Sequence, residues 1–166
     1  MMQQNSSSNG QTTAQLQLVS FTVGDELFAV DILSVQEINR MMSLTKVPQS
    51  IDGIEGVINL RGRIIPVLDL RVQFGLVPSE LSEESRIIVV EVQGNTIGFI
   101  VDSVQQVLLI DRSIIEPTPQ MTTSIDSSYV DGMAKLDDDL LILLNLDNLL
   151  SPEALSKLSS MQRTAA

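Results

Sequence analysis

The stretch that decides the fold is GVINLRGRIIPVLDLR, residues 56–71. Two apolar runs rich in β-branched side chains flank the polar tripeptide Arg61-Gly62-Arg63. Such runs on either side of a glycine are typical of a β-hairpin, and Gly62 suits a two-residue turn because glycine adopts a positive φ without strain. The stretch therefore predicts strand, turn and strand. Pro66 cannot donate a hydrogen bond to a sheet, so we expect its strand at an edge or locally irregular.

The same pattern returns later in the chain. At a shift of 76, residues 56–70 fall on residues 132–146 without a gap. At a shift of 69, residues 34–38 fall on residues 103–107. Apolar positions agree between the copies, and the mismatch is concentrated at the turn, where the arginines of one copy meet Asp137-Asp138-Asp139 of the other. The repeat predicts two copies of one small β unit, and the opposite charges at the tips predict two different binding tasks.

Short apolar runs separated by glycine turns continue along the rest of the chain, which is typical of small β-barrels. One copy alone is marginal in size, since a domain of about 60 residues buries only about 60% of the surface of its unfolded chain. We therefore expect the two copies to share a seam, with a groove between them. Residues 32–38 are too few to assign by periodicity, so a helical turn and a strand both stay open.

The ends of the chain complete the predicted organisation. Residues 1–15 carry no charge and no apolar run, which predicts a disordered tail. The folded unit is expected at 16–150, with pseudo-repeated β subdomains at roughly 16–76 and 86–150 on either side of a polar linker. The Ser-Pro-Glu sequence that follows is a helix start signal, so we expect a C-terminal helix over 151–161.

The composition excludes several classes of function. The chain has no Cys and no His, which rules out disulfide scaffolds, Cys/His zinc sites and Ser-His or Cys-His nucleophiles. Ten basic against 21 acidic side chains give a net charge of −11, so nucleic acid and anionic membrane surfaces are poor partners. No apolar run approaches the ~20 residues of a membrane helix, and the first residues lack the regions of a signal peptide.

Catalytic and ligand-binding motifs are also missing from the sequence. The three adjacent aspartates lack the alternating spacing of a calcium loop, and neither a P-loop nor a dinucleotide fingerprint occurs. An enzyme that used carboxylates alone would need two acids facing each other, and the sequence offers only tip and turn acids. We therefore expect no cofactor, no metal and no enzymatic activity.

Three segments together resemble a known family. They are DILSVQEI at residues 31–38, GVINLRGRIIPVLDLR at residues 56–71 and GFIVDSV at residues 98–104. These segments are similar to the CheW family of bacterial chemotaxis coupling proteins, and the resemblance extends over about residues 16–150. The Asn-Leu-Arg-Gly turn, followed by an apolar strand and Asp-Leu-Arg, is its most specific part.

The resemblance implies an all-β fold of two intertwined five-stranded SH3-like β-barrels with a C-terminal helix. It implies a non-catalytic adaptor that bridges the cytoplasmic tip of a chemoreceptor and the regulatory domain of the histidine kinase CheA. That kinase domain shares the fold, so coupler and kinase modules can alternate in rings with other CheW-like domains. The protein would then act in the cytoplasm, at the inner face of the membrane, through receptor arrays. The alternative is the same module in a non-flagellar array that serves surface motility or development.

The resemblance also implies the residues of the binding sites. Receptor binding falls on Arg61, Gly62, Gly56, Val35 and Glu37, and a kinase contact falls on Glu116 and Met121. From the residues alone, Arg61 is either a donor for an acidic or carbonyl-rich partner or a solvated arginine. Val35 can also be interpreted as an ordinary core residue, and Glu37 as a solvated acid. The two glycines can be interpreted as purely structural. The proline-bearing loop around Glu116 can also be interpreted as a segment that only covers the core.

Overall fold

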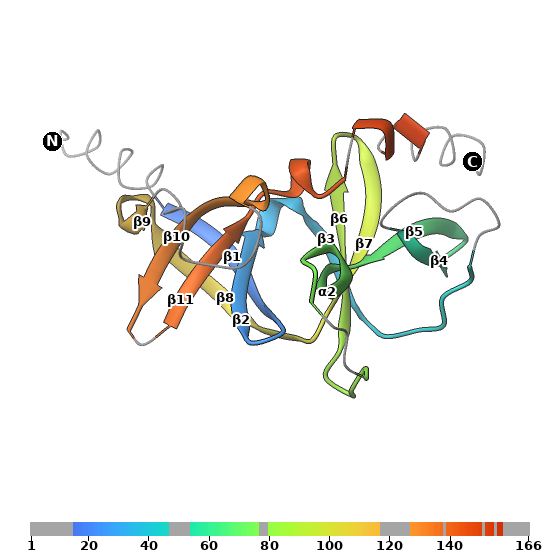
Figure 1. Cartoon of the computed structure of the whole chain (residues 1–166), viewed down its shortest axis with the longest axis horizontal. Coiled ribbons are helices and arrows are strands. Elements are labelled where there is room, and N and C mark those ends of the chain that lie inside the picture. Colours follow the sequence, from blue (N-terminus) through green and yellow to red (C-terminus); the bar gives the residue numbers. More distant parts are fainter. Residues whose placement is uncertain are drawn as a thin grey trace, which may run out of the picture.

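In the part of the chain that the computed structural model describes, eleven β-strands form two sheets that lie side by side along the long axis of the molecule (Figure 1). The structure describes residues 15–46, 54–76, 80–116, 127–137, 139–150, 152–154 and 156–157. Most of the secondary structure is β, as predicted, because short apolar runs rich in β-branched residues alternate with tight turns. No described helix is long and apolar enough to cross a membrane.

The six-stranded sheet has the strand order β8-β1-β2-β11-β10-β9. Its strands are β1 (Gln15–Val23), β2 (Glu26–Asp31), β8 (Ser103–Asp111), β9 (Ile115–Glu116), β10 (Val130–Leu136) and β11 (Asp139–Leu144). The five-stranded sheet has the order β3-β6-β7-β5-β4. Its strands are β3 (Val35–Arg40), β4 (Ile54–Leu60), β5 (Arg63–Asp69), β6 (Arg86–Val92) and β7 (Asn95–Val101).

Short helical segments connect or follow the strands. They are η1 (Ile32–Ser34), α2 (Leu70–Gln73), η2 (Arg112–Ile114), η3 (Ser127–Tyr129) and η4 (Leu146–Asn148). The segment left open by the sequence is thus both a helical turn and a strand, since η1 leads directly into β3. Residues 152–154 and 156–157 are helical, and β1 begins at Gln15, the last residue of the predicted tail. Residues 1–14 and 158–166 lie outside the described part of the chain.

The two sheets interlace the halves of the chain. β1 and β2 come from the first half, yet they pair with β8 and β11 of the second half. In the same way β6 and β7 pair with β3 and β5. The sheets therefore do not coincide with the predicted subdomains 16–76 and 86–150, because the β1–β2 and β6–β7 hairpins each lie between two strands of the other half. One sheet has six strands rather than five because the two-residue β9 pairs with β10.

The internal repeat of the sequence is also present in the strand pairing. Gly56 of β4 pairs with Val67 of β5, and Gly132 of β10 pairs with Leu143 of β11. Both hairpins have a register shift immediately before that glycine. The first turn residue of each hairpin has a positive φ, 52° in one and 46° in the other. The two hairpins therefore share their register, their irregularity and the positive φ of their first turn residue.

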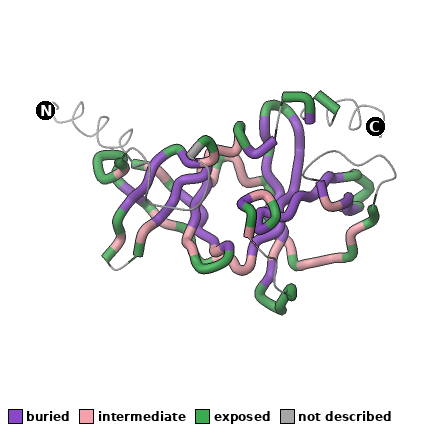
Figure 2. Tube along the Cα trace, viewed as in Figure 1, coloured by how far each residue is buried: buried purple, intermediate pink, exposed green. Residues whose placement is uncertain are grey.

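Three apolar clusters form the core. The largest lies in the seam between the sheets, where Phe21 of β1 meets Phe28 of β2 at a centroid distance of 6.0 Å and Phe99 of β7 at 5.6 Å. Each of the two smaller clusters is made by residues of one sheet. One contains Leu18 and Leu141, and the other contains residues of β4 to β7. Alternate side chains of one strand thus face different clusters. Figure 2 shows buried residues along the central strands of both sheets.

The five-stranded sheet is closed by the segment that follows β3. The Thr45 backbone N–H donates to the Val57 carbonyl oxygen at 2.9 Å, and the Val57 N–H donates back to Thr45 at 2.8 Å. Gly56 lies under this crossing, since a Cβ there would come within 2.9 Å of the Thr45 carbonyl oxygen. In the other sheet a Cβ at Gly132 would come within 3.1 Å of the Glu116 carbonyl oxygen. The repeated glycine thus marks the point where each sheet closes.

Pro66 does not mark an edge strand, because β5 lies between β7 and β4. Its partner across the antiparallel pair is Val57, whose backbone groups bond Thr45 on the opposite side. The Pro66 nitrogen therefore faces β7, and the parallel pairing of β5 with β7 begins one residue later, at Val67. The interior strand tolerates the proline because its missing N–H falls just outside that ladder.

Candidate protein-interaction site

Two of the predicted receptor-binding residues form an ion pair at the end of the five-stranded sheet. Arg61 in the β4–β5 turn donates through Nη2 to Oε2 of Glu37 in β3. β3 and β4 are the first and last strands of that sheet, so the pair joins its two edges. The Arg61 side chain is 69% exposed and the Glu37 side chain 26% exposed. The arginine is therefore held at a tip while most of its surface stays open to a partner.

Glu37 is held from a second side. Asn39 Nδ2, two residues along β3, donates to Glu37 Oε1 at 3.1 Å. The hydrogen bond from Arg61, and then that from Asn39, lower the pKa of the Glu37 carboxyl. The carboxylate is therefore charged at neutral pH with a donor on each oxygen. The Arg61 guanidinium carries five N–H donors, so it can serve Glu37 and a partner together.

The turn that presents Arg61 is a tight hairpin turn with two successive positive φ values. Arg61 has φ 52° and Gly62 has φ 83°, the combination that a two-residue type I′ turn requires. The Gly62 N–H donates to Asn59 Oδ1 at 2.9 Å, which supports the turn from inside. A Cβ at Gly62 would meet no atom within 4 Å, so the glycine is needed for its φ and not for space. The positive φ predicted at Gly62 is confirmed, whereas that of Arg61 had no signal in the sequence.

The other two residues of the predicted receptor set lie deeper. Gly56 is buried beneath the segment that closes the sheet. Val35 begins β3 and packs against the seam cluster. A register shift between Val35 and Glu37 leaves Gln36 as the extra residue, yet both flanking residues keep the more buried side of the strand. The structure thus groups Arg61, Gly62 and Glu37 at the tip and puts Val35 and Gly56 in the framework behind it.

Of the two predicted kinase residues, the structure describes Glu116, which belongs to the other sheet. Glu116 is the last residue of β9, is exposed, and pairs with Met133 of β10. Met121 lies outside the described residues. Figure 1 shows β9 and the β4–β5 hairpin at opposite ends of the molecule. Glu116 and the Arg61 turn therefore lie far apart, on different sheets.

A buried charge cluster at the junction of the sheets was assigned no role from the sequence. Arg71 in α2 donates to Asp69 at the end of β5, with Nε–Oδ1 at 3.0 Å and Nη2–Oδ2 at 2.8 Å. The Arg71 side chain is 5% exposed and the Asp69 side chain 9%. The hydrogen bonds with Asp69 raise the pKa of Arg71 above its ordinary value. The available signal was the Asp-Leu-Arg that ends an apolar run, since charges so placed are buried only when paired.

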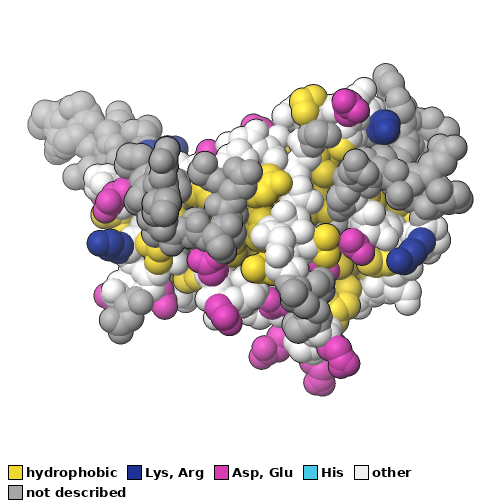
Figure 3. Space-filling view, viewed as in Figure 1, with side chains coloured by type: hydrophobic (Ala, Val, Ile, Leu, Met, Phe, Trp, Pro, Cys, Tyr) yellow, Lys and Arg dark blue, Asp and Glu magenta, His cyan; other side chains and the backbone are white. Residues whose placement is uncertain are grey.

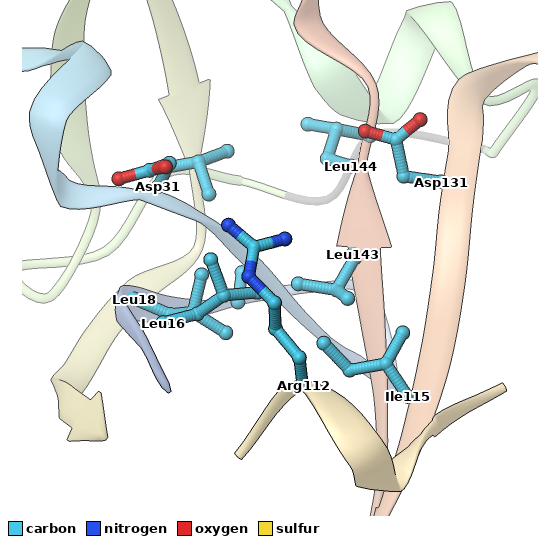
Figure 4. A pocket seen from close by; sticks show the side chains of 10 residues that line it. Leu16, Leu18, Asp31, Arg112, Ile115, Asp131, Leu143 and Leu144 are labelled. Atoms are coloured by element: carbon cyan, nitrogen blue, oxygen red, sulfur yellow. The ribbon is translucent and has the colours of Figure 1, made fainter. Parts of the chain in front are cut away.

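Exposed apolar side chains and a cavity complete the surface. Figure 3 shows acidic side chains spread along the visible face, and apolar side chains over the middle where the sheets meet. Leu33 of η1 is 90% exposed, and Leu109 of β8 is 65% exposed. A cavity of about 340 Å³ opens in the six-stranded sheet, lined by apolar side chains and by the charged side chains of Asp31, Arg112 and Asp131 (Figure 4). Among the described residues, no cluster of acidic side chains is arranged to hold a metal ion.

Comparison with known proteins identifies the family. The model of the CheW-like domain matches residues 17–154. The chemotaxis protein CheW of Klebsiella aerogenes is 34% identical over 155 residues, which covers 93% of each chain. That of Treponema pallidum is 30% identical over 151 residues and 89% of each chain. The crystal structure of the scaffolding protein TtCheW from Thermoanaerobacter tengcongensis superposes with a TM-score of 0.77 at 43% identity, covering 84% of this chain and 90% of that one. The chain that carries this interlaced pair of β-barrels therefore belongs to the CheW-like domain family.

Proposed function

We propose that the protein is a non-catalytic adaptor that couples the cytoplasmic tip of a chemoreceptor to the regulatory domain of the histidine kinase CheA. Relatives that carry the name chemotaxis protein CheW, and a similar structure described as a scaffolding protein, support this function. The observation that carries the proposal is the Arg61 tip, an exposed guanidinium held in place by Glu37 on a rigid turn. In this proposal the protein binds and orients partners, and it works at the inner face of the membrane through receptor arrays.

The receptor face is proposed at the end of the five-stranded sheet. Arg61 supplies the charged hydrogen bonds, and Glu37 holds it in one geometry so that little side-chain entropy is lost on binding. Gly62 leaves the tip without a side chain, so a partner backbone can approach closely. Gly56 and Val35 act indirectly, because one allows the sheet to close and the other anchors β3 to the seam.

The kinase face is proposed on the six-stranded sheet, at Glu116 and the residues that follow it as far as Met121. Glu116 is exposed at the end of β9, and β9 pairs with β10 over only two residues. Two faces on different sheets allow one molecule to hold two partners at once. Because the kinase domain of the family has the same fold, the same faces suit rings in which the two modules alternate.

Titration of the purified protein against each partner tests the proposal. We expect binding to a receptor tip fragment, binding to the CheA regulatory domain, and a ternary complex when all three are mixed. Arg61→Glu should abolish receptor binding and retain kinase binding. Lys157→Glu makes the same charge change at an exposed position of the C-terminal segment and serves as the matched control. Failure of the wild-type protein to bind either partner contradicts the proposal.

A further inference from the structure

The chain crosses between the two sheets twice within the described residues, at η1 and at Asp102. Asp102 separates the last residue of β7 from the first residue of β8. Its backbone N–H donates to the Thr22 carbonyl oxygen at 2.9 Å, and its Oδ2 accepts from the Gly24 N–H at 2.6 Å. Thr22 and Gly24 belong to the β1–β2 hairpin of the six-stranded sheet. The Asp102 carboxylate is thus fixed to the six-stranded side of the junction.

Arg71 approaches the same carboxylate from the five-stranded side. Its Nη1 lies 3.6 Å from Asp102 Oδ1, while Nε and Nη2 hold the two oxygens of Asp69. The Asp69 Oδ1 also accepts from the Arg71 backbone N–H at 2.9 Å, which caps α2. Two parallel hydrogen bonds fix the plane of a guanidinium, so the direction of its third nitrogen is also fixed. A chain of charges therefore runs from β5 through Arg71 to the hairpin of the other sheet.

The rest of the junction is mostly apolar, and apolar contact has no preferred direction. Phe74 at the end of α2 stacks on Phe28 at 5.0 Å between centroids, a contact that tolerates a change in the angle between the sheets. Gln73 Nε2 adds two neutral hydrogen bonds, to the Leu149 carbonyl oxygen at 2.6 Å and to the Tyr129 hydroxyl at 3.4 Å. A buried ion pair adds little net stability compared with an apolar replacement, and its value is in selecting one arrangement.

We propose that Arg71 is a positioning residue that sets the angle between the two barrels by gripping Asp69 and reaching Asp102. Its consequence for partners rests on the proposed function, because the angle matters when two partners bind different barrels of one molecule. The affinity of a partner that contacts only one barrel does not depend on the angle between the barrels. A ternary complex that must fit into a larger array depends on it. Arg71 therefore acts through the framework and touches neither partner.

The test separates orientation from stability. Asp102→Asn keeps an oxygen for the Gly24 N–H and removes the charge that faces Arg71. The double variant Arg71→Met with Asp69→Asn removes the pair and keeps the oxygen that caps α2. Asp131→Asn is the matched control, since Asp131 is an exposed aspartate of β10 that accepts from Asn145.

Spin labels report the angle directly, and the absence of native Cys makes the labelling clean. Labels at Glu91→Cys in β6 and Lys135→Cys in β10 place one probe on an exposed position of each sheet. We expect a single narrow distance distribution in the parent and the Asp131→Asn control, and broad distributions in both test variants. Thermal stability should change little in Asp102→Asn. Assembly of the ternary complex should fall about tenfold, a usual size for coupling between two sites, while receptor binding alone should stay near that of the parent.

Narrow, unshifted distributions in both test variants overturn the proposal. So does a loss of thermal stability with an unchanged distribution, which would assign the cluster a purely structural role. Broad distributions with a normal ternary complex refute the link to partner assembly. If the parent protein binds no receptor or kinase, the proposed function fails, and the distance measurement still decides whether Arg71 sets the angle.

Discussion

Arg61 and Glu37 lie 24 residues apart in the chain, and their ion pair connects the turn at one edge of the five-stranded sheet to the strand at the other. The pair places a mostly exposed guanidinium on a turn whose backbone has little freedom. Reversing Arg61 to Glu sets two carboxylates against each other and presents the wrong charge to an acidic partner. We expect receptor affinity to fall by more than about tenfold, since like charges across an interface cost several kcal/mol. Circular dichroism should show an intact fold, and an unfolded variant contradicts the placement of Arg61 at a surface tip.

Acid should release the Arg61 side chain from Glu37. The pKa of Glu37 is lowered in the folded state by Arg61 and then Asn39, so its interactions support the fold above the unfolded pKa, about 4.3 for Glu. This support is lost as the pH falls through the lower, folded value. Side-chain resonances of Arg61, followed by NMR, should therefore shift in that acid range. In Glu37→Gln they should not titrate there, and an identical titration in both proteins would show that Glu37 does not hold Arg61.

The two repeated hairpins should separate in function. Reversal of Arg61 and Arg63 should weaken receptor binding and spare kinase binding. Conversion of Asp137, Asp138 and Asp139 to Asn should leave receptor binding intact and stabilise the protein slightly, because adjacent like charges repel until salt screens them over about 8 Å. Titration of each variant against the receptor tip and the kinase domain measures this. Equal loss of receptor binding in both variants would refute the division of tasks.

The glycines under the closing segments should matter for stability. Gly56→Ala brings a Cβ to within 2.9 Å of the Thr45 carbonyl oxygen, and Gly132→Ala brings one to within 2.8 Å of Ile115 Cγ2. Overpacking of this kind costs about 1–3 kcal/mol. Gly62→Ala meets no atom and should cost about 1–2 kcal/mol through its left-handed backbone alone. Urea denaturation measures all three, and full stability of Gly56→Ala would contradict the closed sheet.

Residues 1–14 should be dispensable. They contain no apolar run whose burial would offset the entropy cost of ordering the backbone, about 1–2 kcal/mol per residue. Deletion of residues 1–14 should leave the melting temperature and the affinity for the kinase domain unchanged. A large loss of either quantity would contradict the tail assignment.

Local sequence patterns predicted much of the fold. The hairpin around Arg61-Gly62-Arg63, its repeat and the glycine turns follow from short-range sequence, because a β-turn and its flanking strands are specified within a few residues. The family followed from the same segments. The interlacing was implied only by the family resemblance, because the parallel pairs of β5 with β7 and β11 with β2 join strands that are distant in sequence and no local pattern predicts them. Of the two alternatives predicted for Pro66, the edge position is wrong and the local irregularity holds, since pairing with β7 begins one residue after the proline. The edge strands of a sheet are known only once all its pairings are known.

The candidate site was predicted in part for the same reason. Arg61 and Gly62 are neighbours in one turn, so their association was visible in the sequence. The contact of Arg61 with Glu37, the cover of Gly56 by Thr45 and the reach of Arg71 to Asp102 all depend on how the sheets close and meet. No local rule connects those positions.

The interlacing also decides the order in which the molecule is completed during synthesis. Ser20 Oγ donates to the Gln106 carbonyl oxygen 86 residues later in the chain, so β1 has no neighbour on that side until β8 has left the ribosome. β2 waits still longer, for β11. The nascent first half therefore emerges with two unpaired strand edges, and a fold rich in such distant pairings forms slowly. A truncated message would yield a fragment that aggregates rather than half an adaptor, because neither sheet can be built from one half of the chain.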